Sequence, residues 1–225
     1  MATAILVDGG FFLKRYRTIF ADIWLQRNAK QVAEDFHKTL VKHLHDKNGK
    51  QVRELYRILY YDCPPLTKKL HQPISKTSFD ASKSREAVFR LEFFEELRRL
   101  RKVALRLGHL SDHAGWRIKP DAQKALLTGA RQVADLEDGD FEIETRQKGV
   151  DMKIGVDIAS LAYKRQADQI ILVAGDGDFV PAAKLARREG IDFVLDPMWA
   201  PVPDDLHEHV DGLQSVWPKP KPRVK

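Results

Sequence analysis

The sequence contains a single cysteine, Cys63, among 225 residues. One cysteine cannot form a disulfide within the chain, which excludes a fold held together by internal disulfides. Long apolar runs are also missing. No segment approaches the roughly 18 uninterrupted apolar residues that cross a bilayer, and Asp8 interrupts the first apolar run too early for a signal peptide. We therefore expect a soluble, cytoplasmic, globular protein with no membrane partner.

Several motifs that handle phosphate are absent as well. The first strand-like run is followed by Gly9, Gly10 and Phe11 rather than by the Gly-x-Gly-x-x-Gly turn of dinucleotide-binding folds. No Walker Gly-Lys-Ser/Thr occurs, and position 10 is Gly where haloacid-dehalogenase phosphatases need a second Asp. These absences argue against a nucleotide-binding enzyme and against that class of phosphatase.

Positive charge is in excess and is unevenly distributed. The net charge is +6, and residues 67–106 alone carry eleven Lys or Arg against five Asp or Glu. A further four cations lie in the Pro-rich segment 214–225, so the remainder of the chain is slightly acidic. This distribution suits a protein that holds cations in one place and phosphates in another, although solvated helix faces would give the same pattern.

Hydrophobic periodicity predicts alternating strands and helices. Buried strands are expected at 3–8, 52–61, 169–174 and 191–195, and amphipathic helices at 29–46, 84–104, 151–164 and 179–189. In the helix at 84–104, one apolar stripe is expected to run through Val88, Leu91, Phe94, Leu97 and Leu100. The β-α-β order favours a parallel sheet with crossover helices, which is an α/β three-layer sandwich with a mainly parallel central sheet.

We expect one domain over residues 1–213 with a basic, Pro-rich, extended tail at 214–225. Residues 66–147 are expected to form a helical and β insertion between the second strand and the helix that Lys148 precedes. Within it, the pattern predicts a strand pair from 103–111 and 115–119, a small helix at 121–133 and a strand at 141–145.

Four aspartates stand where a parallel sheet presents its ligand site. Asp8 ends the first strand, Asp176 and Asp178 follow the strand at 169–174, and Asp151 lies in the first turn of the next-to-last long helix. Ligands of open α/β sheets bind beyond the carboxyl ends of the strands, at the point where strand order reverses. If the strands that end near Asp8 and Ala174 are neighbours across that reversal, the four carboxylates converge.

Such a cluster needs a cation, because two like charges about 4 Å apart repel by roughly 4 kcal/mol at an effective dielectric constant of 20. An all-oxygen ligand set selects Mg²⁺ or Mn²⁺, and a bound ion of this kind activates water and stabilises charge on a phosphate. Each residue also has a simpler explanation. Asp8 is a natural helix cap, the Gly-Asp-Gly-Asp run at 175–178 suits a plain turn, and Asp151 suits a helix N-terminus.

The residues that carry these acids resemble a known family. Residues 6–11 (LVDGGF), 148–151 (KGVD) and 170–179 (IILVAGDGDF) are similar, in order, to the three signature blocks of NYN domains in the PIN-like nuclease superfamily. The resemblance covers residues 3–18 and 148–213 well and 57–65 more loosely. Residues 66–147 are not recognised.

The resemblance implies a metal-dependent nuclease, an endoribonuclease that hydrolyses phosphodiester bonds with Mg²⁺ or Mn²⁺ held by Asp8, Asp151, Asp176 and Asp178. RNA is the expected substrate, with single-stranded DNA as the alternative, and a non-catalytic RNA-binding or regulatory module on the same fold is the second hypothesis. One departure stands out: many NYN domains have Asn three residues after the first Asp, where this chain has Phe11. The sequence does not specify an oligomeric state.

Other residues are candidates for supporting roles. Asp62 is interpreted either as a residue that supports the metal ligands from behind or as a residue that stabilises the turn before Pro64 and Pro65. Lys148 and Lys153 either contact the scissile phosphate or balance the charge of nearby residues. Nucleic-acid contacts are expected from a cationic helix end and from one aromatic side chain that can stack on a base, with helix-dipole complementation and ordinary packing as the alternatives. These residues are Arg98, Arg99, Arg101, Lys102 and Trp116.

Overall fold

We describe a computed structural model of the chain, covering residues 1–111, 115–145 and 147–221. In these residues, six strands pair into one fully parallel sheet in the order β12-β11-β10-β1-β2-β5. The strands are β1 (Ala2–Asp8), β2 (Glu54–Asp62), β5 (Val103–Leu107), β10 (Gln169–Val173), β11 (Asp192–Leu195) and β12 (Gly212–Leu213). The predicted parallel α/β sheet is confirmed.

Strand order reverses next to β1. From β1 the chain builds outward through β2 and β5, then crosses back to place β10 on the other side of β1 and continues to β11 and β12. Val7 pairs with Val173, so the strands of Asp8 and Ala174 end at the same level. The predicted neighbours across the reversal are therefore neighbours in the structure.

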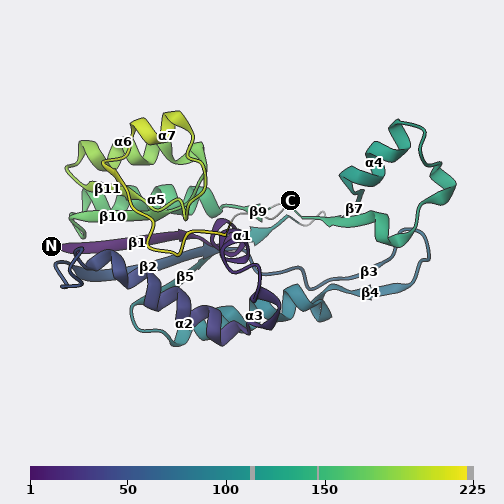
Figure 1. Ribbon diagram of the computed structural model, residues 1–225, viewed down its shortest axis with the longest axis horizontal. Coiled ribbons are helices and arrows are strands. Elements are labelled where there is room, and N and C mark those ends of the chain that lie inside the picture. Colours follow the sequence, from purple (N-terminus) through teal and green to yellow (C-terminus); the bar gives the residue numbers. More distant parts are fainter. Residues whose placement is uncertain (112–114, 146, 222–225) are drawn as a thin grey trace.

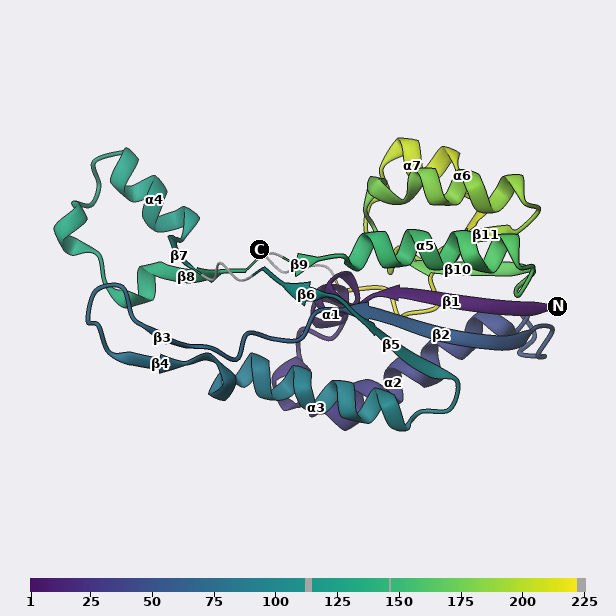
Figure 2. The ribbon, with the colours of Figure 1, turned by 180° about the vertical axis from the view of Figure 1, so that it is seen from behind.

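Helices cover both faces of the sheet (Figures 1 and 2). Side chains alternate along β1: Ile5 and Val7 face one helical layer, whereas Ala4 and Leu6 face the other. The first layer contains α1 (Gly9–Ile19), α2 (Ala29–Leu40) and α3 (Arg85–Arg99), and the second contains α5 (Val150–Tyr163), α6 (Val180–Arg188) and α7 (Asp204–Glu208). Burial of strands on both faces explains why their sequences read as continuous apolar runs.

An arm extends from the sheet on the side toward which the strands run, as both views show (Figures 1 and 2). It contains two antiparallel pairs and a short helix, namely β3 (Lys69–His71) with β4 (Ser78–Asp80), β7 (Gly115–Ile118) with β8 (Phe141–Glu144), and α4 (Pro120–Leu127). The pairs are joined by a hydrogen bond from Trp116 Nε1 to the His71 carbonyl at 2.9 Å and by an edge contact between Trp116 and Phe79. A third short pair, β6 (His109–Leu110) with β9 (Gln147–Lys148), lies where the arm meets the sheet.

The segment 66–147 differs from the expected insertion in one respect. Helix α3 packs in the layer of α2, and β5 is a strand of the central sheet, so both belong to the central unit and the arm is made from the residues on either side of them. The predicted strand pair of 103–111 with 115–119 is wrong. Residues 103–107 pair with β2 and residues 115–118 pair with β8 instead.

The Pro-rich segment also differs from the extended tail that was expected. Trp217 is 3% exposed, and its ring packs against Phe12 at 5.6 Å and Tyr16 at 5.9 Å between ring centroids. Its carbonyl accepts a hydrogen bond from Trp199 Nε1 at 2.7 Å. The segment up to this residue is therefore part of the core of the α1–α3 layer.

None of the helices in the described residues combines the length and apolarity needed to cross a membrane.

The turn from β1 into α1 depends on a close approach at Gly9. A Cβ atom at this position would lie 2.5 Å from the ring of Tyr60 and 2.7 Å from the backbone oxygen of Tyr61. Tyr60 is fully buried among the α1–α3 core and cannot move aside. Only glycine therefore lets α1 begin directly after Asp8.

We expect Gly9→Ala to lower the free energy of unfolding by about 1–3 kcal/mol, because overpacking a rigid site forces backbone and ring shifts. The matched control is Gly155→Ala, since Gly155 lies within α5 and a Cβ there meets nothing within 4 Å. That variant should gain about 0.5–1 kcal/mol from improved helix propensity. Urea unfolding of the two variants measures both, and equal stabilities would contradict the packing argument.

Candidate active site

Asp8 is placed by the end of β1 and the start of α1. Its side chain caps α1 and accepts a hydrogen bond from the Phe11 backbone N–H at 3.1 Å. The capping interpretation of Asp8 is thus correct, but capping occupies only the Oδ1 atom. The carboxylate stands at the carboxyl edge of the sheet with further acceptor capacity.

Asp176 and Asp178 lie in the turn that follows β10. Asp176 precedes the short 3₁₀ helix η6 (Gly177–Phe179), and its Oδ1 accepts the Asp178 backbone N–H at 3.2 Å. Both aspartates are exposed. A Cβ on Gly177 would lie 3.3 Å from Oδ2 of Asp205 in α7, so another carboxylate, not noticed in the sequence, approaches the same turn.

Asp151 lies in the first turn of α5, whose N-cap is Gly149. Gly149 has φ of +80°, which is a left-handed conformation that side chains disfavour, and it offers no side chain to cap the helix. The N-terminus of α5 approaches η6, and its helix packs over β1 and β2. The structure thus brings the start of α5 to the edge that bears Asp8 and Asp176.

The charges of these carboxylates are coupled. Burial is the largest cause that raises the pKa of Asp8 from 3.8 to about 6, and the negative charges of Asp151 and Asp62 add to it, while the hydrogen bond from Phe11 opposes it. Burial likewise raises the pKa of Asp151, followed by repulsion from Asp176 and Asp178. These interactions connect all four predicted acids through Asp151.

The acids suit a divalent cation by their chemistry, because their donors are all carboxylate oxygens and mutual repulsion disfavours the ionised cluster. In the part of the chain that the structure describes, however, no group of three or more His, Cys, Asp or Glu side chains is close enough to hold a metal together. An ion would have to draw the side chains inward from these positions. Their role as metal ligands stays a prediction.

Asp62 is fully buried at the end of β2, one residue beyond Tyr61, the residue that pairs with Asp8. It forms an ion pair with Arg90 of α3 and accepts hydrogen bonds from Tyr60 Oη at 3.1 Å and from the Cys63 backbone N–H at 2.7 Å. The sequence analysis did not identify Arg90. The spacing of Arg90 along the helix could have predicted that it points inward, because Arg90, Phe94 and Leu97 share one face of α3 and Phe94 and Leu97 are buried.

Lys148 and Lys153 flank the start of α5, which places them near the carboxylate edge. Both side chains are exposed, and neither has a hydrogen bond or ion pair among the described contacts. Phe11 lies three residues after Asp8, and its ring occupies the space above Gly175, where a Cβ would lie 2.5 Å from Cε2 of the ring. The aromatic ring therefore packs on the turn after β10 and makes no polar contact there.

The predicted nucleic-acid contacts on α3 are not brought to this edge. Arg98 and Arg99 lie at the end of α3 and pair with Glu95 and Glu96 on the same helix. Because α3 runs antiparallel to the strands, residues 98–102 precede β5 at the amino edge of the sheet, roughly 15 Å or more from the carboxyl ends. Arg101 and Lys102 share that position, and the Lys102 amino group donates to the Leu55 carbonyl.

Trp116, the aromatic candidate, lies in the arm. Its contacts there are the Phe79 ring and the His71 carbonyl, so the packing alternative describes its position better than free stacking.

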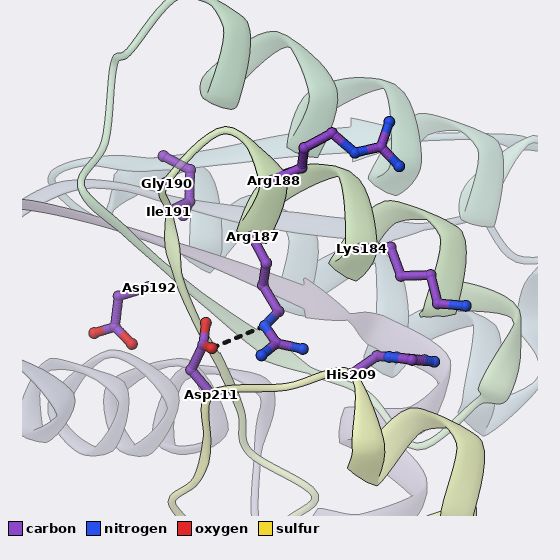
Figure 3. A pocket seen from close by; sticks show the side chains of 8 residues that line it. All are labelled: Lys184, Arg187, Arg188, Gly190, Ile191, Asp192, His209 and Asp211. Carbon is purple, nitrogen blue, oxygen red and sulfur yellow. Dashed lines mark hydrogen bonds and ion pairs between the residues drawn. The ribbon is translucent and has the colours of Figure 1, made fainter.

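A cavity of about 720 Å³ has none of the four acids in its wall. Figure 3 shows the side chains that line it. It is lined by residues of α6, β11 and the segment after α7, and Arg187 in its wall forms an ion pair with Asp211 at 2.8 Å. Asp192 stands at the start of β11, which puts the cavity at the amino edge of the sheet. Size alone does not mark the site in this fold, where ligands bind beyond the opposite edge.

Comparison with protein families supplies an independent finding. The family model of the NYN domain matches residues 91–201, a stretch that includes Asp151, Asp176 and Asp178. The match also includes β5 and part of the arm, which the sequence-based resemblance did not cover. The match is consistent with a domain of the PIN-like nuclease superfamily and confirms the resemblance. A comparison with curated proteins finds no match.

The raised pKa of Asp8 predicts a stability that depends on pH in the absence of metal. Its folded-state pKa lies above the unfolded value, so its contribution is complete below about pH 4 and is lost as the pH rises through about 6. Asn keeps the capping acceptor and removes the charge. We expect Asp8→Asn to equal the wild type at pH 4 and to exceed it by about 1–3 kcal/mol at pH 8, measured by urea unfolding with chelator present. A difference that does not change with pH would contradict the assigned burial and repulsion.

Proposed function

We propose that this chain is a metal-dependent endoribonuclease, because the model of the NYN domain, a family that generally contains nucleases, matches residues 91–201. The observation that supports the proposal is the electrostatic repulsion that links Asp151 to Asp8 and to Asp176 and Asp178, at the carboxyl edge where β1 and β10 flank the reversal of strand order. Carboxylates that repel one another at this position lower the stability of the free protein. They favour binding of a cation, which in turn can contact a phosphodiester.

In the proposed reaction, Asp8, Asp151, Asp176 and Asp178 hold Mg²⁺ or Mn²⁺. Such an ion would supply a polarised water and positive charge beside the scissile phosphate. Burial raises the pKa of Asp8 to about 6. The hydrogen bond by which Asp8 caps α1 fixes the orientation of its side chain. Asp62 stays paired with Arg90 and holds its negative charge behind Asp8, which strengthens the attraction of the edge for a cation.

The chain's own groups also suit the approach of a phosphate. The N-termini of α1 and α5 both begin at this edge, and the positive ends of their dipoles offset part of the carboxylate charge. Lys148 and Lys153 stand exposed beside Asp151 and are the proposed contacts to the phosphate. RNA is the proposed substrate, with single-stranded DNA as the comparison that decides the class of nucleic acid.

The alternative function is a non-catalytic RNA-binding module on the same fold. Two observations favour it: the described acids are not close enough to hold an ion without movement, and Phe11 replaces the amide that many relatives carry. The two functions differ in one readout, which is whether bound RNA is cut when a divalent cation is added.

We expect the purified chain to cut labelled single-stranded RNA with Mg²⁺ or Mn²⁺ and to stop when chelator is added. Asp8→Asn and Asp176→Asn should each lower the rate by about 100-fold or more, because the stabilisation they support is worth several kcal/mol. The control is Asp22→Asn, which removes an exposed partner of Lys221 and should leave the rate unchanged. Equal cutting by all three folded variants would point to a contaminant, and binding without cutting would establish the alternative.

A further inference from the structure

A second cavity, of about 230 Å³, lies at the root of the arm. Its wall combines apolar side chains from the loop after β2, from the hairpin β3–β4 and from β6 and β8 with several polar groups, among them Arg90 and Gln147. The apolar side chains include Leu66, Phe79, Leu110 and Ile143. The cavity is smaller than the roughly 300–1,000 Å³ sites of drug-sized ligands. It suits a ligand the size of one ring system.

Two side chains connect this cavity to the acidic edge. Gln147 Nε2 donates to Asp62 Oδ1 at 3.4 Å, and the Arg90 guanidinium forms an ion pair with the same carboxylate. Asp62 ends β2 one residue beyond the partner of Asp8. A ligand in the cavity is therefore separated from the site of the four acids by Asp62 and its two partners.

The charges of the cavity wall are already paired. Arg90 pairs with Asp62, so it offers no free positive charge to an anion, and Glu86 pairs with Arg17 at 2.6 Å, so it offers no free negative charge to a cation. Donors remain, however. The Gln147 side chain is exposed, and the second contact of Arg90 Nη2, to the Cys63 carbonyl, is long at 3.2 Å. The wall thus offers hydrogen bonds and apolar contact to a neutral, planar, polar ligand.

We propose that this cavity receives one nucleobase of the RNA strand, beside the phosphate that reaches the acidic edge. The inference rests on the proposed function and extends it, because it names where the enzyme grips its substrate. A base meets the chemistry of the wall: its ring contacts Phe79, Leu66 and Ile143, and its edge atoms bond to Arg90 and Gln147. The sugar and phosphate stay outside, toward Asp8.

The test measures binding rather than cutting. Short single-stranded RNAs of one length, each with an abasic site at a different position, are titrated against the full chain by fluorescence anisotropy without divalent cation. Removal of the base at one position should weaken binding by about tenfold, with little effect elsewhere. When Mn²⁺ is added, the sensitive position should adjoin the cleaved bond.

Filling the cavity should remove that sensitivity. In Leu66→Trp the affinity for intact RNA should fall to that of the abasic RNA, and the abasic penalty should disappear, since both changes remove the same contact. Thr145→Trp, at the exposed rim of the cavity, is a second filling variant that leaves the core intact. The control is Leu127→Trp, because Leu127 is 80% exposed on α4 and lines no part of the cavity.

The outcomes separate this inference from the proposed function. A penalty that is absent at every position, or that persists in both folded filling variants, overturns the base pocket even if the chain cuts RNA. A penalty that vanishes on filling supports the pocket even if no cutting occurs. A wild-type chain that binds no RNA overturns both.

Discussion

The parallel pairing of β1 with β10 is the constraint on which the rest of the structure depends. It brings residue 8 and residue 174 to the same level although they are distant in the chain, and it creates the reversal of strand order beside which Asp8 and Asp176 follow their strands. Burial on both faces stabilises this pairing. If β1 left the sheet, Ile5 and Val7 would be exposed on one side and Ala4 and Leu6 on the other.

The acidic edge is assembled at some cost to stability, and neighbouring contacts set its geometry. Gly9 lets Tyr60 pack directly beneath the start of α1, and Gly149 turns the chain into α5 in a conformation that other residues disfavour. The buried pair of Asp62 and Arg90 adds negative charge behind Asp8 without leaving that charge unpaired. Repulsion between carboxylates concentrated at one edge is typical of functional sites, where local rules are broken for a purpose.

Much of this arrangement was readable from the sequence. The runs that form β1, β10, β11 and the second half of β2 are almost entirely apolar, and helical patterns separate them, so their identity and parallel order followed from local pattern. Asp8 and Asp176 could be placed together because the position of a strand end in a parallel sheet is a matter of topology.

Other features depend on contacts that no local pattern encodes. The partner of β5 is β2, which lies some forty positions earlier, whereas the segment that follows it in sequence suggested a hairpin. Within α3, Val88 and Leu91 are more than 40% exposed, whereas Ala87 and Phe93 are buried. The buried face of the helix is therefore rotated about the helix axis from the apolar stripe that the sequence predicted. That rotation concealed Arg90. The position of residues 98–102 at the amino edge, by contrast, could have been deduced, because a helix that crosses back between parallel strands ends at the edge where the next strand begins.

The burial of Trp217 bears on how the protein is made. Its ring packs against Phe12 and Tyr16 of α1, so the hydrophobic layer over β1 is incomplete until a residue translated long afterwards has left the ribosome. Until then, the nascent first strand and helix would present apolar surface with no native cover, and such surface favours aggregation or capture by chaperones. The hydrophobic layer over β1 is thus completed only after the segment around Trp217 has been synthesised.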